Sequence, residues 1–389
     1  MNLRRCASLH GLKGTGVRMA TLLLACVLCT AIPQAAAQTA TPAQASVSAT
    51  DANVSQPAPP VAPPELRLRV VGGLAGLTQH TQFEAPFWTR DLPRLSHGRF
   101  RADIVPFDRA GVPGTEMLRL MQLGVVPFGT VLMSSLAVQY PQYAAVDLPG
   151  LHPDMGQLRA SLEVFRPHLE KALRDEMGIE LLALYAYTAQ VLFCKQPLKE
   201  LADLRDRRVR VSSAAQGDFF GALQARPQRL PFAQVAASMA SGASDCAVTG
   251  AMSGNSIGLH RHSTHLYPMP ITWGVAIFGA NRAAWQALPD DLRTLLLAEL
   301  PRLELAIWRS AEHETEQGVA CNVGSPRCTA GRQGAMKLVP VTKQDEARRD
   351  DILRTVVLPS WLQRCGAQCA DIWQRTIGPA RGIALPAAP

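Results

Sequence analysis

Apolar and polar residues alternate with two different periods between residues 203 and 258. Short stretches with a period of two predict strands, and the stretches between them have the longer period of a helix. The predicted order is strand, helix, strand, helix, strand, at about 208–212, from 216, 228–230, 232–240 and 246–248. This order predicts an open, mostly parallel sheet covered by helices, whose ligands bind at the carboxyl ends of the strands.

Further strands and helices alternate on both sides of this segment. Strands are predicted at 65–71, 100–105, 125–133, 179–194 and 266–281, and helices at about 78–95, 154–177 and 285–313. Gly178 follows the second of these helices, in the position where a glycine commonly ends a helix. The pattern therefore predicts an α/β protein.

The length and the charge narrow this picture. A chain of 389 residues is too long for one compact core, so two lobes with appendages are predicted. Apolar residues make up 47% of the chain and charged residues 18%, which is typical of a globular protein. The net charge is +8, but four basic and no acidic residues precede residue 38, which leaves 35 basic and 31 acidic residues beyond it. Basic and acidic residues alternate along this part of the chain, and no strip of basic and aromatic residues occurs in it. Nucleic-acid binding is therefore not expected.

The N-terminal 37 residues have the three regions of a secretory signal. A basic start precedes an apolar run at 19–32, and three alanines at 35–37 predict cleavage after the last of them. The apolar run is too short for a comfortable membrane span. A lipoprotein site at Cys26 fits its flanking residues less well. Residues 38–64 are rich in Pro and Ala and are predicted to be an extended spacer.

Polar or aromatic side chains stand at three places where a cleft is expected. Arg210 lies inside a predicted strand, where a cation is costly unless it faces a cleft or a partner. Ser134 and Ser135 end another strand, and either donate to a bound anion or cap the next helix. Trp273 either stacks on a ligand or belongs to the core.

The cysteines indicate disulfide bonds. Three precede residue 38, and the other six are Cys194, Cys246, Cys321, Cys328, Cys365 and Cys369. An even number in an oxidising compartment is typical of disulfides. The first two lie on predicted strands and are expected to pair, and the next two would close a short loop. The last two either bridge each other or pair with that loop. A metal site is the rival interpretation, but no His lies at ligand spacing from these cysteines.

Motifs of catalysis by a nucleophile, a phosphate loop or zinc are absent from the sequence. His260, His262 and His265 do not share one helix face, so a solvated loop is predicted there. A secreted enzyme remains a second hypothesis, with Asp245 or Asp218 as its general base. Asp245 is alternatively a brace for its own turn. We expect neither a metal nor a cofactor.

Three groups of residues resemble the substrate-binding proteins of tripartite ATP-independent periplasmic (TRAP) transporters, of the C4-dicarboxylate type. They are the proline and glycine loop at 107–118, the segment 201–245 and residues 278–292. The second group contains Val-Arg-Val at 209–211, Leu-Pro-Phe-Ala-Gln-Val at 230–235 and Ser-Gly-Ala-Ser-Asp at 241–245. The order and spacing of the groups carry the resemblance, which extends from about residue 66 to residue 300.

The resemblance implies a two-lobe periplasmic binding protein, type II-like, with a hinge of crossing strands and a long helix. Lobe I would comprise residues 65–187, rejoined by about 272–300, and lobe II residues 188–271. Residues 301–389 would form C-terminal helices and a Cys-containing extension that pack on the lobes. The hinge crossings would lie at Gln190 and Trp273.

The resemblance also implies a receptor that captures a small organic acid in the periplasm and delivers it to the membrane subunits of a TRAP transporter. Arg210 would form a salt bridge with the carboxylate of the substrate. Gln190 is the nearest polar residue on a strand where other members often have a second arginine, and Thr249 lies where Glu-Asn-Pro is common. The substrate therefore stays open between a dicarboxylate, a keto acid, a sugar acid and an aromatic acid. A sensory receptor with a membrane kinase as partner is a further alternative.

Overall fold

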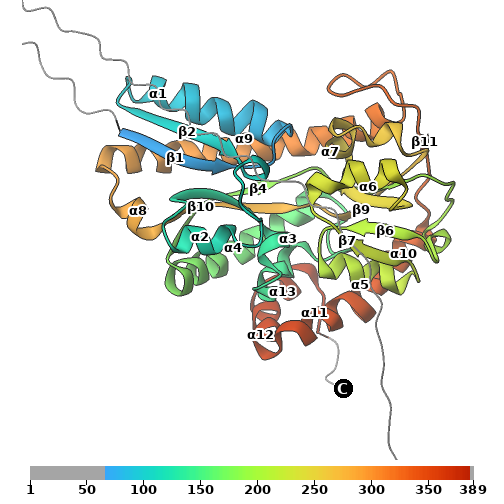
Figure 1. The fold of residues 1–389 in the computed structure, drawn as a ribbon. Helices are drawn as coiled ribbons and strands as arrows, with labels where there is room; N and C mark the ends of the chain where they lie inside the picture. Colours follow the sequence, from blue (N-terminus) through green and yellow to red (C-terminus); the bar gives the residue numbers. More distant parts are fainter. Residues whose placement is uncertain (1–65, 386–389) are drawn as a thin grey trace, which may run out of the picture. The chain divides into compact units, whose positions relative to one another are not determined.

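The computed structural model of the protein describes residues 66–385. The predicted signal peptide (1–37) and the predicted spacer (38–64) lie outside the described residues. Two β-sheets with surrounding helices make up the described part of the chain (Figure 1). Within it, the helices are too short or too polar for any of them to span a membrane.

The first sheet contains five strands. They are β1 (Leu66–Gly72), β2 (Phe100–Pro106), β3 (Phe128–Leu132), β4 (Ile179–Ala186) and β10 (Val275–Asn281). Their order in the sheet is β2-β1-β3-β10-β4. β1 runs parallel to β2 and β3, whereas β10 runs antiparallel to β3 and β4. Helical segments connect the parallel strands, as parallel connections require, and the predicted α/β class is confirmed.

The second sheet contains six strands. They are β5 (Gln190–Cys194), β6 (Arg208–Val211), β7 (Arg226–Arg229), β8 (Cys246–Gly250), β9 (His265–Thr272) and β11 (Lys337–Leu338). Their order is β11-β9-β5-β8-β6-β7. β6 is parallel to β7 and β8, and β5 is antiparallel to β8 and β9. The carboxyl end of β8 therefore lies beside Gln190, the first residue of β5, which pairs with Gly250.

The chain passes between the two sheets at two short segments and along one long helix. Residues 187–189 join β4 to β5, and Trp273 with Gly274 joins β9 to β10. The predicted single strand at 179–194 is thus two strands, because its halves pair in different sheets. The long helix α9 (Asp290–Asn322) contacts β4 of the first sheet and α7 (Ala251–Ser256) beside the second. Its 33 residues span about 50 Å.

The other helices follow the predicted pattern with one clear difference. The α-helices are α1 (Leu92–Leu95), α2 (Met117–Gln122), α3 (Met133–Leu136), α4 (Met155–Met177), α5 (Ala214–Ala222), α6 (Val235–Ser241) and α8 (Arg282–Gln286). α4 is capped by the Asp154 side chain, which accepts from the Gln157 amide at 2.8 Å, and ends at Gly178 with φ 64°. Residues 78–95 are helical throughout, as predicted, but contain the π-helical turns η1 (Gln79–Glu84) and η2 (Phe87–Asp91) before the short α1. Pro86 and Pro93 lack the amide hydrogen that a regular α-helix would use at these positions.

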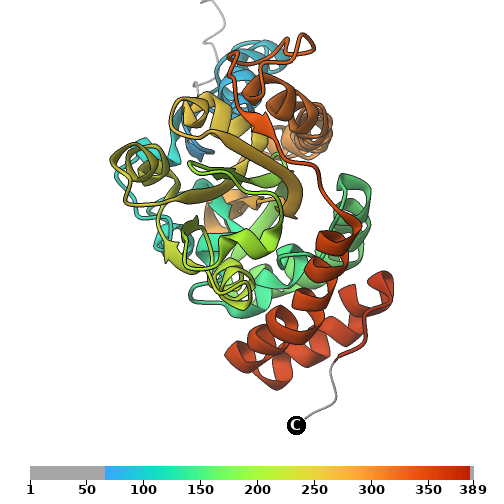
Figure 2. The same ribbon diagram turned by 90° about the vertical axis from the view of Figure 1, so that its right-hand side faces the viewer.

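The C-terminal extension packs beside both sheets. Its helices are α10 (Lys343–Ile352), the π-helical η8 (Leu353–Val357), α11 (Leu358–Cys365), α12 (Ala367–Arg375) and α13 (Ile377–Arg381), gathered in red at one end of the molecule in Figure 2. Elsewhere in residues 66–385, the 3-10 helices are η3 (Phe107–Arg109), η4 (Pro141–Asp147), η5 (Leu201–Leu204), η6 (Phe232–Gln234) and η7 (Leu259–Arg261). η8 and α11 contact α5, whereas α12 contacts η4 and α13 contacts α4. The Trp361 indole donates to the Pro141 carbonyl at 2.8 Å, which fixes α11 against η4.

Three disulfide bonds join the six cysteines of the described residues. Cys194–Cys246 links the paired strands β5 and β8, as predicted, and Cys321–Cys328 closes the loop after α9. Cys365 lies beside Cys369, with their Cα atoms 5.6 Å apart, and not beside that loop, which favours the first of the two predicted alternatives. Gly366, with a φ of 62°, lies between these two cysteines and separates α11 from α12.

Candidate functional site

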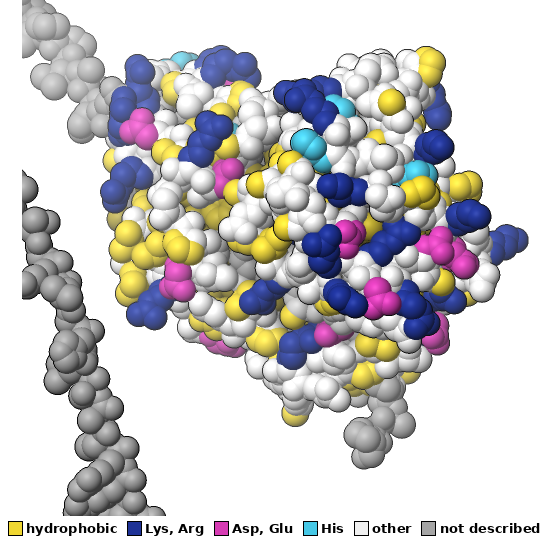
Figure 3. All heavy atoms as spheres, turned by 45° about the vertical axis from the view of Figure 1, so that its right-hand side comes forward, with side chains coloured by type: hydrophobic (Ala, Val, Ile, Leu, Met, Phe, Trp, Pro, Cys, Tyr) yellow, Lys and Arg dark blue, Asp and Glu magenta, His cyan; other side chains and the backbone are white. Residues whose placement is uncertain are grey.

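A cavity of about 550 Å³ lies between the two sheets. Residues of the first sheet and its loops line one wall, including Asp108, Ser134 and Ser135. The ends of β5, β6, β7 and β8 line the other wall. In the space-filling view, apolar side chains gather in the hollow of this face (Figure 3). A cavity of this size, mostly apolar with few polar groups, is typical of a small-molecule site.

Arg210 is the buried cation of this cavity. Its side chain is 2% exposed, and its Nε and Nη2 donate to the Leu230 carbonyl at 3.0 and 2.6 Å. Nη1 donates to the Val248 carbonyl at 2.8 Å. Burial lowers the pKa of the guanidinium to about 10, so it is charged at neutral pH. Among the described residues, no carboxylate lies within 4.0 Å of it. Since a guanidinium has five N–H donors, two remain for a carboxylate ligand.

Four of the other predicted site residues line the same cavity, namely Gln190, Thr249, Ser134 and Ser135. Gln190 begins β5, and its Oε1 accepts from Gln216 Nε2 at 2.8 Å. Thr249 is 4% exposed on β8. The two serines do not cap a helix, because the strand ends earlier and both lie inside α3. Five of the predicted site residues, these four and Arg210, therefore line one cavity.

Trp273 lies elsewhere, and the hypothesis that it stacks on a ligand is wrong. Its indole is 3% exposed and donates through Nε1 to the His152 carbonyl at 2.9 Å. Its backbone amide donates to Asp147 Oδ1, also at 2.9 Å. The side chain is therefore part of the hinge core, and the following residue, Gly274, lines the cavity in its place. Its alternative interpretation as a core residue is confirmed.

Sequence reasoning missed several residues that line the cavity, among them Phe107, Asp108, Ser212, Arg229 and Phe232. Each of them follows or ends a strand or lies in the loop just beyond it, which is the signal that could have identified them. Arg229 is exposed at the end of the edge strand β7. Asp108 Oδ1 accepts from the Ala75 amide at 2.8 Å, so part of its hydrogen-bonding capacity is used by the protein.

The two carboxylates proposed as a general base do not line the cavity. Asp245 accepts from the Arg208 side chain at 2.6 and 3.0 Å and from its amide at 2.8 Å, and these bonds lower its pKa. Asp218 pairs with Arg364 at 2.6 Å. Both are braces between segments. Among the described residues, no three His, Cys, Asp or Glu side chains are placed to hold a metal ion.

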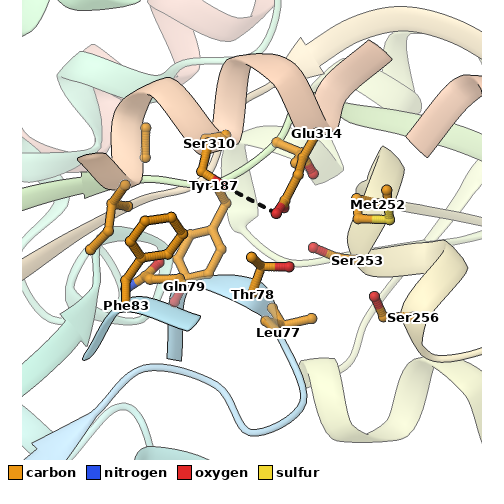
Figure 4. A pocket seen from close by; sticks show the side chains of 14 residues that line it. Leu77, Thr78, Gln79, Phe83, Tyr187, Met252, Ser253, Ser256, Ser310 and Glu314 are labelled. Carbon is orange, nitrogen blue, oxygen red and sulfur yellow. Dashed lines mark hydrogen bonds between the residues drawn. The ribbon is translucent and has the colours of Figure 1, made fainter. Parts of the chain in front are cut away.

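A second, much smaller chamber lies at the hinge (Figure 4). Its volume is about 20 Å³, enough for one water molecule. Ser310 donates to Glu314 Oε1 at 3.1 Å, and burial raises the pKa of Glu314. Tyr187 and Ser253 line both this chamber and the large cavity. An organic acid does not fit here, so the large cavity is the candidate site.

The comparison with protein families gives the chain its family. A model described as bacterial extracellular solute-binding protein, family 7, matches residues 75–325. The chain belongs to this family. The resemblance to TRAP substrate-binding proteins is thereby confirmed, and family 7 membership agrees with the predicted location in the periplasm.

Solved structures with similar folds support the assignment to family 7. An extracytoplasmic solute receptor from Bordetella pertussis that binds pyroglutamic acid has 21% sequence identity and a TM-score of 0.69, covering 79% of this chain and 98% of its own. A TRAP periplasmic solute-binding protein from Desulfovibrio salexigens with bound orotic acid has 16% identity and a TM-score of 0.72, covering 82% and 99%. One from Sulfurospirillum deleyianum with bound succinate has 18% identity and a TM-score of 0.69, covering 80% and 98%. The search of curated proteins found no match.

Proposed function

We propose that the protein captures a small organic acid in the 550 Å³ cavity and delivers it to the membrane subunits of a TRAP transporter. Arg210 binds the carboxylate of this acid through its two remaining N–H donors. The ligands bound in the three similar structures, pyroglutamic acid, orotic acid and succinate, are all carboxylic acids and support this ligand class. Movement about the hinge segments would enclose the acid between the two walls of the cavity.

The buried and unpaired charge of Arg210 carries this proposal. A pKa lowered from 12.5 to about 10 corresponds to about 3 kcal/mol, the cost of keeping the side chain charged inside the protein. A carboxylate in the cavity offsets this cost, because it supplies the missing opposite charge in a place that water reaches poorly. Arg208, two residues earlier on the same strand, has the carboxylate of Asp245 beside it, whereas Arg210 has none among the described residues.

The bound acid leaves the cavity chemically unchanged. Asp108 is the single carboxylate among the described residues that line the cavity. Its Oδ1 accepts from the Ala75 amide, which gives it an anchoring role for the loop. Incubation with each bound acid, followed by mass spectrometry, tests this point, and a mass change that depends on the protein would contradict it.

The experiment that tests the proposal compares two arginines of one strand. The mature protein, Arg210→Ala and Arg208→Ala are screened by thermal shift and calorimetry against carboxylic acids. Arg208 is the matched control because it lies two residues away on β6, with its side chain paired to Asp245 outside the cavity. A ligand at 100 times its dissociation constant stabilises the protein by about 2.7 kcal/mol.

We expect Arg210→Ala to lose at least about 2 kcal/mol of binding free energy, or roughly 30-fold in affinity, because a buried charge pair is broken. Arg208→Ala should bind with the affinity of the unchanged protein. Equal binding by Arg210→Ala and the unchanged protein, or no stabilisation by any carboxylate, would show that Arg210 is structural.

A further inference from the structure

Gln216 forms a fixed network of hydrogen bonds at one end of the cavity. It lies in the first turn of α5 and is 1% exposed. Its Oε1 accepts from the Ser212 backbone amide at 2.8 Å and from Ser212 Oγ at 3.1 Å. Its Nε2 donates to Gln190 Oε1 and to Thr272 Oγ1, both at 2.8 Å. All hydrogen-bonding positions of this amide are therefore used by the protein.

This network determines which way the Gln190 amide faces. A backbone N–H can only donate, so Ser212 requires the oxygen of Gln216 on its side and the NH2 group on the other. Gln190 must then turn its own oxygen toward Gln216. Its NH2 group is left beside Gly274, where an added Cβ would lie 2.8 Å from Nε2. Gln190 and Gly274 both line the large cavity, and both also line a chamber of about 30 Å³ beside Gln216 and Thr272, so the Gln190 N–H donors next to Gly274 are within reach of a ligand in the large cavity.

The positive charges lie toward the other end of the cavity. The strand order β5-β8-β6-β7 places Gln190 on one side of β8 and Arg210 on the other, with Arg229 one strand further away. Gln190 pairs with Gly250, whereas Arg210 pairs with Ala247, three residues earlier on β8. Their backbones are therefore separated by about 10 Å across the sheet and by about 10 Å along the strands. The lining residues nearest to Gln190 in the sheet are Thr249 and Gly250, and both are neutral.

We propose that Gln190, positioned by Gln216, selects acids whose second polar group is a neutral carbonyl oxygen and not a second carboxylate. This inference rests on the proposed function, in which Arg210 holds the first carboxylate. A carbonyl oxygen exchanges its hydrogen bond with water for one from an N–H of Gln190. A second carboxylate would lose its water at this end of the cavity without meeting a cation, which is unfavourable.

The test uses acids that differ at one end only. Calorimetry at pH 8 compares succinate with 4-oxopentanoate and glutarate with 5-oxohexanoate, in which a methyl ketone replaces the second carboxylate of an equally long chain. We expect the oxo acid of a pair to bind at least tenfold more tightly than the dicarboxylate. Gln190→Leu keeps the volume but removes the donor, and should reduce oxo-acid affinity several-fold without strengthening dicarboxylate binding.

Gln216→Glu tests the positioning role separately. A glutamate still accepts from the Ser212 amide but cannot donate to Gln190, which would turn its NH2 group inward and present its oxygen to the ligand. We expect this variant to lose the preference for the oxo acid while keeping its dependence on Arg210. A merely structural role would lower the affinity for both acids of a pair equally and leave their ratio unchanged.

The outcomes separate this inference from the proposed function. Dicarboxylates that bind more tightly than the oxo acids, with Arg210→Ala still abolishing binding, overturn the Gln190 inference alone. Dicarboxylate binding that Arg229→Ala removes would place the second carboxylate at the exposed edge strand and also overturn it. If neither class binds in an Arg210-dependent manner, both the inference and the proposed function fail.

Discussion

Asp147 joins the hinge to the helical segment η4, and we predict that it makes the stability of the protein depend on pH. Its Oδ1 accepts from the Trp273 amide and its Oδ2 from the Gly274 amide, both at 2.9 Å. Burial of the carboxyl raises its pKa from 3.8 to about 7, although these two amides favour the charged form and lower the pKa. The perturbation that tests this is Asp147→Asn.

Unfolding releases the Asp147 proton, so the stability of the protein falls as the pH rises. The folded protein keeps the Asp147 proton up to about pH 7, whereas the unfolded chain releases it near pH 3.8. The contribution of Asp147 to the free energy of unfolding is therefore largest at low pH and falls as the pH rises toward 7. Each pH unit inside this window changes it by about 1.4 kcal/mol. Between pH 5 and pH 8 the fall amounts to about 2.5 kcal/mol.

Urea unfolding of the unchanged protein and of Asp147→Asn at pH 5, 6, 7 and 8 measures this contribution. The asparagine loses one of the two acceptors, which lowers stability by an amount that does not change with pH. From pH 5 to pH 8, the unchanged protein should therefore lose about 2.5 kcal/mol of unfolding free energy relative to Asp147→Asn. A difference that stays constant within about 0.5 kcal/mol would show that the carboxyl is ionised throughout, and would refute the reasoning.

Two further predictions concern the same hinge. Burial lowers the pKa of His152 to about 3, so below pH 6.5 the unfolded chain takes up a proton that the folded protein does not. His152 therefore makes the protein more stable as the pH rises from 5 to 7, and this gain offsets the loss that Asp147 causes over the same range. In His152→Gln the gain is absent, so urea unfolding should show a fall in stability of about 2 kcal/mol from pH 5 to pH 7. An unchanged pH profile would contradict this. Gly274→Ala should cost about 1 to 2 kcal/mol of stability because of its φ of 73°, and should also weaken ligand binding by displacing Gln190. Gly258→Ala is the control, since its φ of 81° is similar but its nearest neighbouring atoms lie 3.9 Å away. Equal ligand affinity in both glycine variants would contradict the displacement.

Much of the fold could be predicted because its patterns are local. The alternating residues of β6, the helix α5 and the apolar β8 follow from period and composition within short windows. Gly178 ends α4 as a C-terminal glycine should. The division of residues 179–194 into β4 and β5 was not predictable in this way, because pairing partners far away in the chain decide to which sheet each half belongs.

In the candidate site, too, local features could be predicted from the sequence and contacts between distant residues could not. Arg210 could be identified because a cation inside a predicted strand is costly unless it faces a cleft or a partner, which the sequence itself indicates. For Trp273 the sequence left two interpretations, a ligand contact and a core residue, and only the bond of its indole to the His152 carbonyl shows that it belongs to the core. Asp245 required the structure as well, because its partner Arg208 is 37 residues away.

Gln216 marks the limit of what the sequence can predict. A glutamine in the first turn of a helix is ordinary, and nothing in its neighbourhood sets it apart. Its role arises from bonds to residues 4, 26 and 56 positions away, which meet only after β5, β6 and β9 have taken their places. The charged group of the site is visible in the sequence because burying a charge is costly everywhere. The neutral groups that decide between ligands are not visible, because the direction in which an amide points depends on the folded backbone around it.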